Sequence, residues 1–238
     1  MDKKLKAVVL FKKDFKDKDV LATLFTVEEG LVNVLLRGVK KSGAKLKYAK
    51  ELFTFAEFGV SSKGDNGLYI VTSCDVIENF GNLAQDPQKY LEALSIVSAI
   101  KDLGGYGEQN IKLFFALINA LQTLSFDDVT EKIVLCKFLY DIMEISGYQL
   151  NFDKCADCGS KFSGRKLFAQ RIGGFVCLGC RAPDCLDVSE VVFSNLRILS
   201  KMDYNNLKNL KLSNLGELFD FISQIIVQRP GIKIKLYS

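Results

Sequence analysis

Histidine is absent from this sequence of 238 residues. Imidazole is the commonest general acid–base group in enzymes and the commonest protein ligand for metal ions. A catalytic zinc site usually combines histidine or carboxylate ligands with an open position for water. The sequence therefore argues against an active site of this kind, and a metal site must be built from other side chains.

Prolines and long hydrophobic runs are also scarce. The chain has only three prolines and no low-complexity tract, which argues against disordered linkers. Its first apolar run, Ala7 to Phe11, has five residues and is too short for the apolar region of a signal peptide. No stretch approaches the roughly 20 apolar residues that span a bilayer. We therefore expect a soluble protein of the reducing cytoplasm, with no membrane partner.

Four of the seven cysteines form two Cys-x-x-Cys pairs. The pairs are Cys155/Cys158 and Cys177/Cys180, and 18 residues separate them. A tight turn lets each pair direct two thiolates at one ion, and this spacing is typical of a structural zinc site with four cysteine ligands. The residues between the pairs predict a short hairpin that carries the second pair back to the first.

Other interpretations of these cysteines remain open. Two disulfides would suit a secreted chain, which nothing in the sequence indicates. Four free thiols are a second alternative. A catalytic zinc site is a third, against which the lack of histidine argues. Cys185 lies five residues after Cys180. We expect it to be a bystander, with replacement of a ligand as the alternative.

The first 80 residues contain five short runs rich in β-branched and aromatic residues, separated by polar turns. Such runs predict β-strands. Five short strands suit a small closed barrel, because closure removes exposed sheet edges. We expect an OB-fold, with another five-stranded topology as the alternative. The predicted strands are Leu5–Phe11, Val20–Val27, Leu31–Leu36, Leu52–Phe58 and Leu68–Val76.

A basic segment, Arg37 to Lys50, lies between the third and fourth predicted strands. It carries six basic residues and no acidic one. On a barrel rim such a segment is a natural contact for a phosphate backbone, although a solvated lysine-rich loop would have the same composition. A second lysine group, at residues 12–18, alternates with aspartates, and we expect a solvated turn there. Phe15 and Tyr48 are the best candidates for stacking on bases, because they lie in polar loops.

From residue 81 onward the apolar residues recur with a helical period. Start and end signals divide residues 81–150 into three helices with short connections, which predicts an antiparallel bundle. Asp86 and Pro87 start the first helix as N-cap and first helical residue. The expected helices are 87–103, 109–124 and, after a capping box at Asp128 and Glu131, 131–147.

Beyond the cysteine pairs the pattern becomes helical again. Residues 189–201 are ambiguous between strand and helix. Asn214 and Glu217 form a capping box for a further helix, which must end before Pro230. The tail at 232–237 alternates apolar and basic residues, as in a short strand or an extended arm.

These segments predict an α+β multidomain chain, in which an N-terminal five-stranded OB-fold β-barrel precedes an α-helical bundle with an inserted four-cysteine zinc module. The expected domains are 1–80 (OB-fold), 81–150 (first helical part), 151–185 (zinc-binding module) and 186–238 (second helical part). Charge is uneven among them. Residues 1–80 carry 14 basic and 11 acidic side chains, residues 81–150 carry 5 and 9, and residues 151–238 carry 13 and 8. A polyanion should therefore meet the two ends of the chain rather than its acidic middle.

This order of parts resembles the RecO family of bacterial recombination mediators. The opening of the chain is similar to that family's N-terminal signature in the strand Val20 to Thr26, in Glu29-Gly30-Leu31 and in the run from Arg37 to Ser42. The resemblance covers essentially the full length. It implies a DNA-binding protein rather than an enzyme. It also implies that Zn²⁺ is structural, because some members lack the cysteines.

The resemblance further implies binding of single- and double-stranded DNA and annealing of complementary strands. It implies loading of recombinase onto strands coated by single-strand-binding protein. The partners it implies are RecR and the acidic C-terminal tail of single-strand-binding protein, at the nucleoid in the cytoplasm. By the family's pattern we expect DNA contacts at Arg37, Lys40, Lys41, Lys45 and Lys47, and then at Arg165, Lys166 and Arg171.

Two other functions fit parts of the sequence. A zinc-dependent nuclease or deaminase would use the cysteine pairs and the basic surface, but a site saturated by four thiolates leaves no position for water. A zinc-containing protein-interaction module without DNA activity would use the acidic middle of the chain. That alternative predicts no affinity for DNA even at low salt, where an electrostatic binder should show some.

Overall fold

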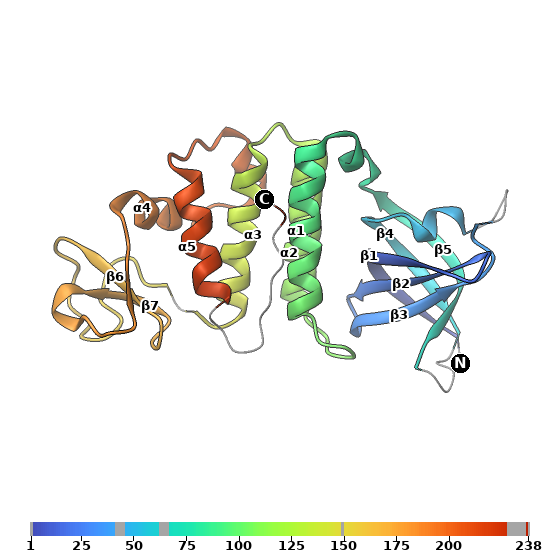
Figure 1. Ribbon diagram of the computed structural model, residues 1–238, viewed down its shortest axis with the longest axis horizontal. Coiled ribbons are helices and arrows are strands. Elements are labelled where there is room, and N and C mark those ends of the chain that lie inside the picture. Colours follow the sequence, from blue (N-terminus) through green and yellow to red (C-terminus); the bar gives the residue numbers. More distant parts are fainter. Residues whose placement is uncertain (1, 41–45, 62–66, 149, 228–236, 238) are drawn as a thin grey trace. The chain divides into compact units, whose positions relative to one another are not determined.

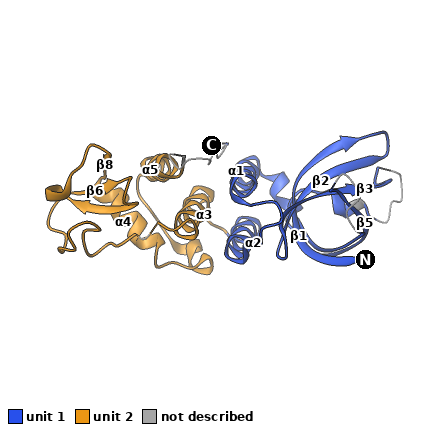
Figure 2. Ribbon diagram, turned by 90° about the horizontal axis from the view of Figure 1, so that it is seen from below, with its two compact units in different colours: residues 1–127, 233–238 blue, residues 128–232 orange. Residues whose placement is uncertain are grey.

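The structure is a computed structural model, and it describes residues 2–40, 46–61, 67–148, 150–227 and 237. The chain divides into two compact units (Figure 2). The first comprises Met1–Asp127 together with Lys233–Ser238, and the second comprises Asp128–Ile232. Within the described residues, none of the helices has the length and apolar character needed to cross a membrane.

A closed five-stranded barrel begins the first unit (Figure 1). The strands follow the order β1-β2-β3-β5-β4, and β4 pairs back onto β1. All neighbours are antiparallel except β3 and β5, which run parallel. This topology confirms the predicted OB-fold. The strands are β1 (Lys3–Phe15), β2 (Asp19–Thr26), β3 (Gly30–Leu36), β4 (Thr54–Val60) and β5 (Tyr69–Asn79).

The barrel interior is filled by alternating apolar side chains from all five strands. Leu5, Ala7 and Val9 of β1 face Leu24 of β2 and Phe58 of β4 in one buried cluster. This alternation is the period of 2 expected of strands with one buried face. The barrel is therefore built around a packed apolar core.

Predicted strand boundaries differ from the observed ones by up to four residues, and two of the differences have a clear local reason. The first strand continues to Phe15 rather than ending at Phe11, because it pairs with β2 as far as Phe15↔Asp19. The fourth starts at Thr54 rather than Leu52, because Phe53 adopts a left-handed backbone (φ 64°) that an extended strand cannot include.

Two helices of the first unit pack against the barrel (Figure 1). They are α1 (Pro87–Leu103) and α2 (Ile111–Phe126). As predicted, the Asp86 side chain caps α1 and Pro87 is its first residue. The ring of Phe114 on α2 lies 5.9 Å from that of Phe25 on β2, centroid to centroid. Aromatic contacts of this kind join the helices to the sheet.

The turn between β2 and β3 also fixes the helices to the barrel. Gly30 has φ 64°, and a Cβ there would lie 2.2 Å from the carbonyl oxygen of Glu108. The Leu31 N–H donates to the Gly105 carbonyl at 3.0 Å. Only glycine combines this backbone conformation with so close an approach. The α1–α2 connection is thereby held against the end of the barrel.

Helices and a small sheet form the second unit. The helices are α3 (Glu131–Ile145), α4 (Glu190–Leu199) and α5 (Leu215–Val227), and the strands are β6 (Lys166–Ala169), β7 (Gly174–Cys177) and β8 (Cys185–Asp187). Short 3-10 helices occur in the chain at Lys47–Lys50, Gly81–Gln85, Leu178–Cys180 and Tyr204–Asn209. The predicted hairpin between the cysteine pairs is present as β6 and β7. The third strand, β8, was not predicted.

The helix boundaries of the second unit follow capping side chains. Ser189 accepts a hydrogen bond from the Val192 N–H at 3.2 Å, which resolves the ambiguous segment as a helix. Asp128 does not cap α3, since Thr130 occupies that position. The helix that starts after Asn214 is present as α5. The predicted terminal strand or arm, apart from Tyr237, lies outside the described residues.

The compact units cut the chain differently from the four predicted domains. Helices α1 and α2 belong with the barrel, whereas α3 packs against α5 in the second unit. The cysteine-bearing sheet lies in the chain between α3 and α4. The division at residues 80, 150 and 185 stays a prediction.

Candidate metal centre and nucleic-acid surface

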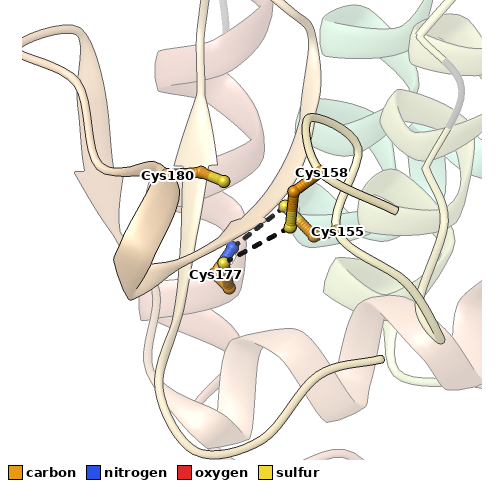
Figure 3. Close-up of side chains that lie close together, drawn as sticks. All are labelled: Cys155, Cys158, Cys177 and Cys180. Atoms are coloured by element: carbon orange, nitrogen blue, oxygen red, sulfur yellow. Dashed lines mark hydrogen bonds between the residues drawn. The ribbon is translucent and has the colours of Figure 1, made fainter. Parts of the chain in front are cut away.

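The four cysteines of the two Cys-x-x-Cys pairs converge on one point (Figure 3). Their sulfur atoms all lie within 4.8 Å of one another. Cys155 and Cys158 come from the loop before β6, whereas Cys177 ends β7 and Cys180 ends the short helix that follows. The hairpin β6–β7 therefore brings the second pair to the first, as the sequence predicts.

Sulfur spacing tests whether zinc fits this cluster. Four thiolates at 2.3 Å from a tetrahedral Zn²⁺ lie about 3.8 Å from one another. The Sγ atoms of Cys158 and Cys177 are 3.8 Å apart. A disulfide needs its two sulfurs at about 2.05 Å, and all seven cysteines are free thiols. The donor set and its spacing are compatible with a metal site of the four-thiolate kind.

Backbone hydrogen bonds hold the two pairs in place. The Cys177 N–H donates to the Cys155 Sγ at 3.3 Å, and the Ala156 N–H donates to the Phe175 carbonyl at 2.8 Å. The first pair closes through the Gly159 N–H, which donates to the Cys155 carbonyl at 3.0 Å. Gly159 has φ 71°, which a residue with a Cβ adopts at a cost. An N–H aimed at sulfur favours the thiolate that a metal requires.

The thiols differ in how readily they ionise. Hydrogen bonds from Ser160 lower the pKa of Cys158 to about 6. The Asp157 carboxylate, through a hydrogen bond to the thiol, raises the pKa of Cys180 well above its usual range. The hydrogen bonds around Cys158 thus favour its thiolate, and those around Cys180 favour its thiol.

Cys185 lies beside the cluster without joining it. Its sulfur accepts the Ala182 N–H at 3.3 Å, and its side chain packs against the small core that includes Leu167 and Val176. Among the described residues, the only group with metal-ligand geometry contains the four predicted cysteines. The roles of these residues as ligands stay predictions, since the geometry does not identify an ion.

The basic segment after β3 is held to the β1–β2 hairpin. The Gly38 N–H donates to Asp19 Oδ1 at 2.8 Å, and the Lys40 ammonium pairs with Asp14 Oδ1 at 2.8 Å. Arg37 is exposed. The aspartates that suggested a solvated turn thus anchor the start of the basic segment.

The other predicted DNA contacts on the barrel are less defined. Lys41 and Lys45 lie outside the described residues. Lys47 begins the 3-10 helix Lys47–Lys50. The assignment of these lysines to DNA binding stays a prediction.

In the predicted zinc module, residues 151–185, the three predicted basic residues have different surroundings. Arg165 pairs with Asp187 at 3.0 Å. Lys166 pairs with Glu190 at 2.8 Å, and its ammonium lies 4.9 Å from the centre of the Phe193 ring. Arg171 is exposed. The assignment of these three residues to DNA binding stays a prediction.

A pocket on the barrel was missed by the sequence analysis. It lies beside Phe11, Thr23 and Asn33, on the outer surface of the sheet. Sequence pattern assigned these residues to strands, but it does not show which strand positions lie side by side. Alternation with the buried residues of β2 and β3 could have placed Thr23 and Asn33 outside the barrel, whereas alternation along β1 predicts that Phe11 points inward.

Comparison with known proteins extends over almost the whole chain. Residues 1–80 match the family model described as "Recombination protein O N terminal". Residues 84–237 match the one described as "Recombination protein O C terminal". The chain belongs to the RecO family. The predicted family resemblance is confirmed, and with it the assignment to DNA repair proteins.

Similar curated proteins carry the name "DNA repair protein RecO". The RecO of Caldanaerobacter subterraneus subsp. tengcongensis is 28% identical over 211 residues, which cover 88% of this chain and 84% of that protein. The RecO of Mycoplasma capricolum subsp. capricolum is 27% identical, over 98% of this chain and 94% of that protein. The RecO of Clostridium kluyveri is 28% identical, over 94% of this chain and 88% of that protein. The similarity therefore covers at least 88% of this chain and at least 84% of each of these proteins.

Proposed function

We propose that this RecO-family protein is a recombination mediator that binds single- and double-stranded DNA and anneals complementary strands. With RecR, it helps to load recombinase onto strands coated by single-strand-binding protein. The observation that carries the DNA-binding part is the OB-fold barrel, whose basic segment is fixed to the sheet through Gly38 and Lys40. RecR and the tail of single-strand-binding protein follow from the family resemblance.

Electrostatics explains why such a protein would speed annealing. Two single strands repel each other through their phosphates, and basic side chains that replace condensed counterions reduce that repulsion. Arg37 on the barrel and Arg171 in the zinc module are exposed cations on separate units. Each unit thus offers its own phosphate contact.

In this proposal the metal ion has a structural role. Cys155, Cys158, Cys177 and Cys180 would hold a Zn²⁺ ion, which supplies a cross-link between the loop before β6 and the end of β7. Four thiolates saturate the ion. The ion would therefore take part in no catalytic step, and the activity we propose is binding of DNA rather than catalysis of a reaction.

An annealing assay tests the proposal. Two complementary labelled oligonucleotides are mixed with and without the protein, at low and at physiological salt. We expect acceleration that declines as salt rises, because phosphate contacts are replaced by counterions. Binding without acceleration would contradict the mediator function. Absence of binding at low salt would favour an interaction module that recognises only protein.

A second assay tests the partner part of the proposal. The protein is immobilised and exposed to purified RecR, and separately to a peptide of the acidic C-terminal tail of single-strand-binding protein. We expect saturable binding of each. A tail peptide in which every acidic residue is replaced by its amide is the matched control. Failure of both partners to bind would leave DNA binding and annealing as the whole activity.

A further inference from the structure

The outer face of the barrel has a mixed surface where β1, β2 and β3 lie side by side (Figure 1). Residues directly opposite each other in a sheet share a face. The register pairs Phe11 with Thr23, and Thr23 with Asn33. It also pairs Lys13 with Leu21. An aromatic ring, a cation, an apolar side chain and two hydrogen-bonding groups are thus adjacent.

A β-bulge places Phe11 on this face. The pairing shifts between Val9 and Phe11, so that Leu10 is the extra residue. Val9 lies in the barrel core, and a regular strand would direct Phe11 to the same side. The bulge instead turns Phe11 outward, where it is half-buried. Re-aiming a side chain in this way is a recurrent use of bulges.

These side chains surround a pocket of about 290 Å³. Phe11, Leu21, Lys12 and Lys13 contribute to its walls, together with Thr23 and Asn33. No carboxylate is among the described residues that line it. A volume near the lower end of the range for small-ligand sites suits one planar group rather than an extended molecule.

The polar wall is ordered by one hydrogen bond. The Thr23 hydroxyl donates to Asn33 Oδ1 at 3.0 Å. Because that bond uses the carbonyl end of the amide, the Asn33 side-chain nitrogen keeps its hydrogens for another acceptor. Carbonyl oxygens at the edges of nucleobases are acceptors of this kind.

Three lysine side chains lie near the Phe11 ring or line the pocket beside it. The Lys101 ammonium lies 5.0 Å from the centre of the Phe11 ring, and Lys12 and Lys13 line the pocket. A base that stacks on an aromatic ring brings its own phosphates to within reach of such groups. The pocket therefore combines a stacking surface, a hydrogen-bonding edge and positive charge.

The hairpin of β1 and β2 also holds the start of the basic segment. Asp14 on β1 pairs with Lys40, and Asp19 on β2 accepts the Gly38 N–H. The exposed Phe15 lies two residues beyond Lys13 on β1, and therefore on the same face of the sheet as Phe11. A strand of nucleic acid that follows the basic segment would therefore run onto the face that holds the pocket.

We propose that this pocket receives one unstacked base of single-stranded nucleic acid, with Phe11 as the stacking surface and Asn33 as the hydrogen-bond donor. The proposal deepens the proposed function and rests on it. A duplex keeps its bases stacked and paired, so the pocket contributes nothing to duplex binding. It gives the barrel a means to prefer unpaired strands.

The test compares three nucleic acids, of which the two single strands carry the same charge. They are an oligothymidylate on the order of 12 nucleotides long, within the range that one OB-fold covers, the same chain with every base removed, and a duplex. Fluorescence anisotropy gives the dissociation constant of each for the wild type and for Phe11→Ala. Removing one stacking ring typically costs on the order of tenfold in affinity. We expect that loss for oligothymidylate, and little change for the abasic chain and the duplex.

Two further variants keep the test decisive if Phe11→Ala disturbs the fold. Phe11→Leu retains an apolar side chain and removes the π face, and Asn33→Ala removes the donor from an exposed position. Phe115→Ala is the matched control, because it removes an exposed ring of the same unit outside the pocket. We expect Phe11→Leu and Asn33→Ala to weaken binding of oligothymidylate, and Phe115→Ala to leave its affinity unchanged.

The outcomes separate this proposal from the function on which it rests. If the wild type binds none of the three nucleic acids, the proposed function fails. If it binds all three but Phe11→Ala weakens them equally, or not at all, the base pocket is overturned while DNA binding stands. If an acidic apolar peptide occupies the pocket, so that Phe11→Ala abolishes peptide binding but leaves oligothymidylate binding unchanged, the pocket is a peptide site.

Discussion

The barrel and the zinc module both present basic surface, but they are stabilised in different ways. The barrel buries side chains from five closed strands in one core. Around the four cysteines, the buried cluster has only four members, of which Cys155 is one. Aromatic rings such as Phe175, 4.9 Å from Phe193 on α4, complete the packing on the other side of the hairpin. In the proposed zinc-bound form, the ion would supply at the cysteine end of the module the cohesion that hydrophobic burial supplies in the barrel.

Removal of two of the four proposed cysteine ligands should have the largest effect, and it should separate the stability of the cysteine module from that of the barrel. In the double variant Cys155→Ser/Cys158→Ser, we expect zinc content to fall from one equivalent to none, because two of four thiolates are lost. Amide hydrogen exchange in β6 and β7 should rise, while exchange in β1–β5 stays unchanged. Mass spectrometry of the metal-bound and digested protein measures both. Cys185→Ser is the matched control and should retain the ion.

Equal zinc content in the double variant and the control would contradict the assignment of these ligands. Loss of protection in the barrel as well would contradict the independence of the two regions.

A core substitution in the barrel should have the converse effect. Phe58 is fully buried in the barrel core, and Phe58→Ala removes its contacts and leaves a cavity. We expect a loss of about 3–5 kcal/mol in the free energy of unfolding of the first unit. Denaturation followed by circular dichroism measures it, with zinc content unchanged. The exposed Val76→Ala should alter stability by less than about 0.5 kcal/mol.

Charge substitutions sharpen the comparison of the two basic surfaces. We expect replacement of Arg37, Lys40, Lys41, Lys45 and Lys47 by alanine to weaken DNA binding for all sequences. The slope of log K against log salt should fall by about 0.7 for each lost contact with a single strand. Replacement of Arg165, Lys166 and Arg171 should have a smaller effect, since Arg165 and Lys166 are already ion-paired. Salt titrations of binding decide this, and an equal or larger effect of the second set would reverse the ranking.

Removal of a helix-capping side chain should have the smallest effect on stability of the substitutions considered. Each unit offers one such cap. Asp86 accepts hydrogen bonds from the N–H groups of Gln88 and Lys89 at the start of α1, and Ser189 accepts one at the start of α4. Asp86→Ala and Ser189→Ala should each cost about 1 kcal/mol. Local hydrogen exchange should report the loss in the first unit for Asp86→Ala and in the second for Ser189→Ala. Thr130→Ala is the control, since its side chain makes no capping hydrogen bond.

The sequence by itself determined the features that depend on short-range chemistry. The two Cys-x-x-Cys pairs, the Asp86-Pro87 helix start and the period-2 runs of the barrel were legible because spacing alone constrains sulfur convergence, capping and strand faces. The family resemblance also followed from the order of these parts, and the comparisons confirm it.

Only the tertiary structure decided how distant strands and charges combine. The Leu10 bulge places Phe11 beside Thr23 and Asn33, and no local pattern reports a register shift between strands. The aspartates near the hairpin tip suggested a solvated turn, yet Asp19 binds Gly38 and Asp14 binds Lys40, 19 and 26 residues further along the chain. Strand pairing and long-range ion pairs depend on where the closed barrel brings separate segments, and that placement is a property of the whole chain rather than of any stretch of it.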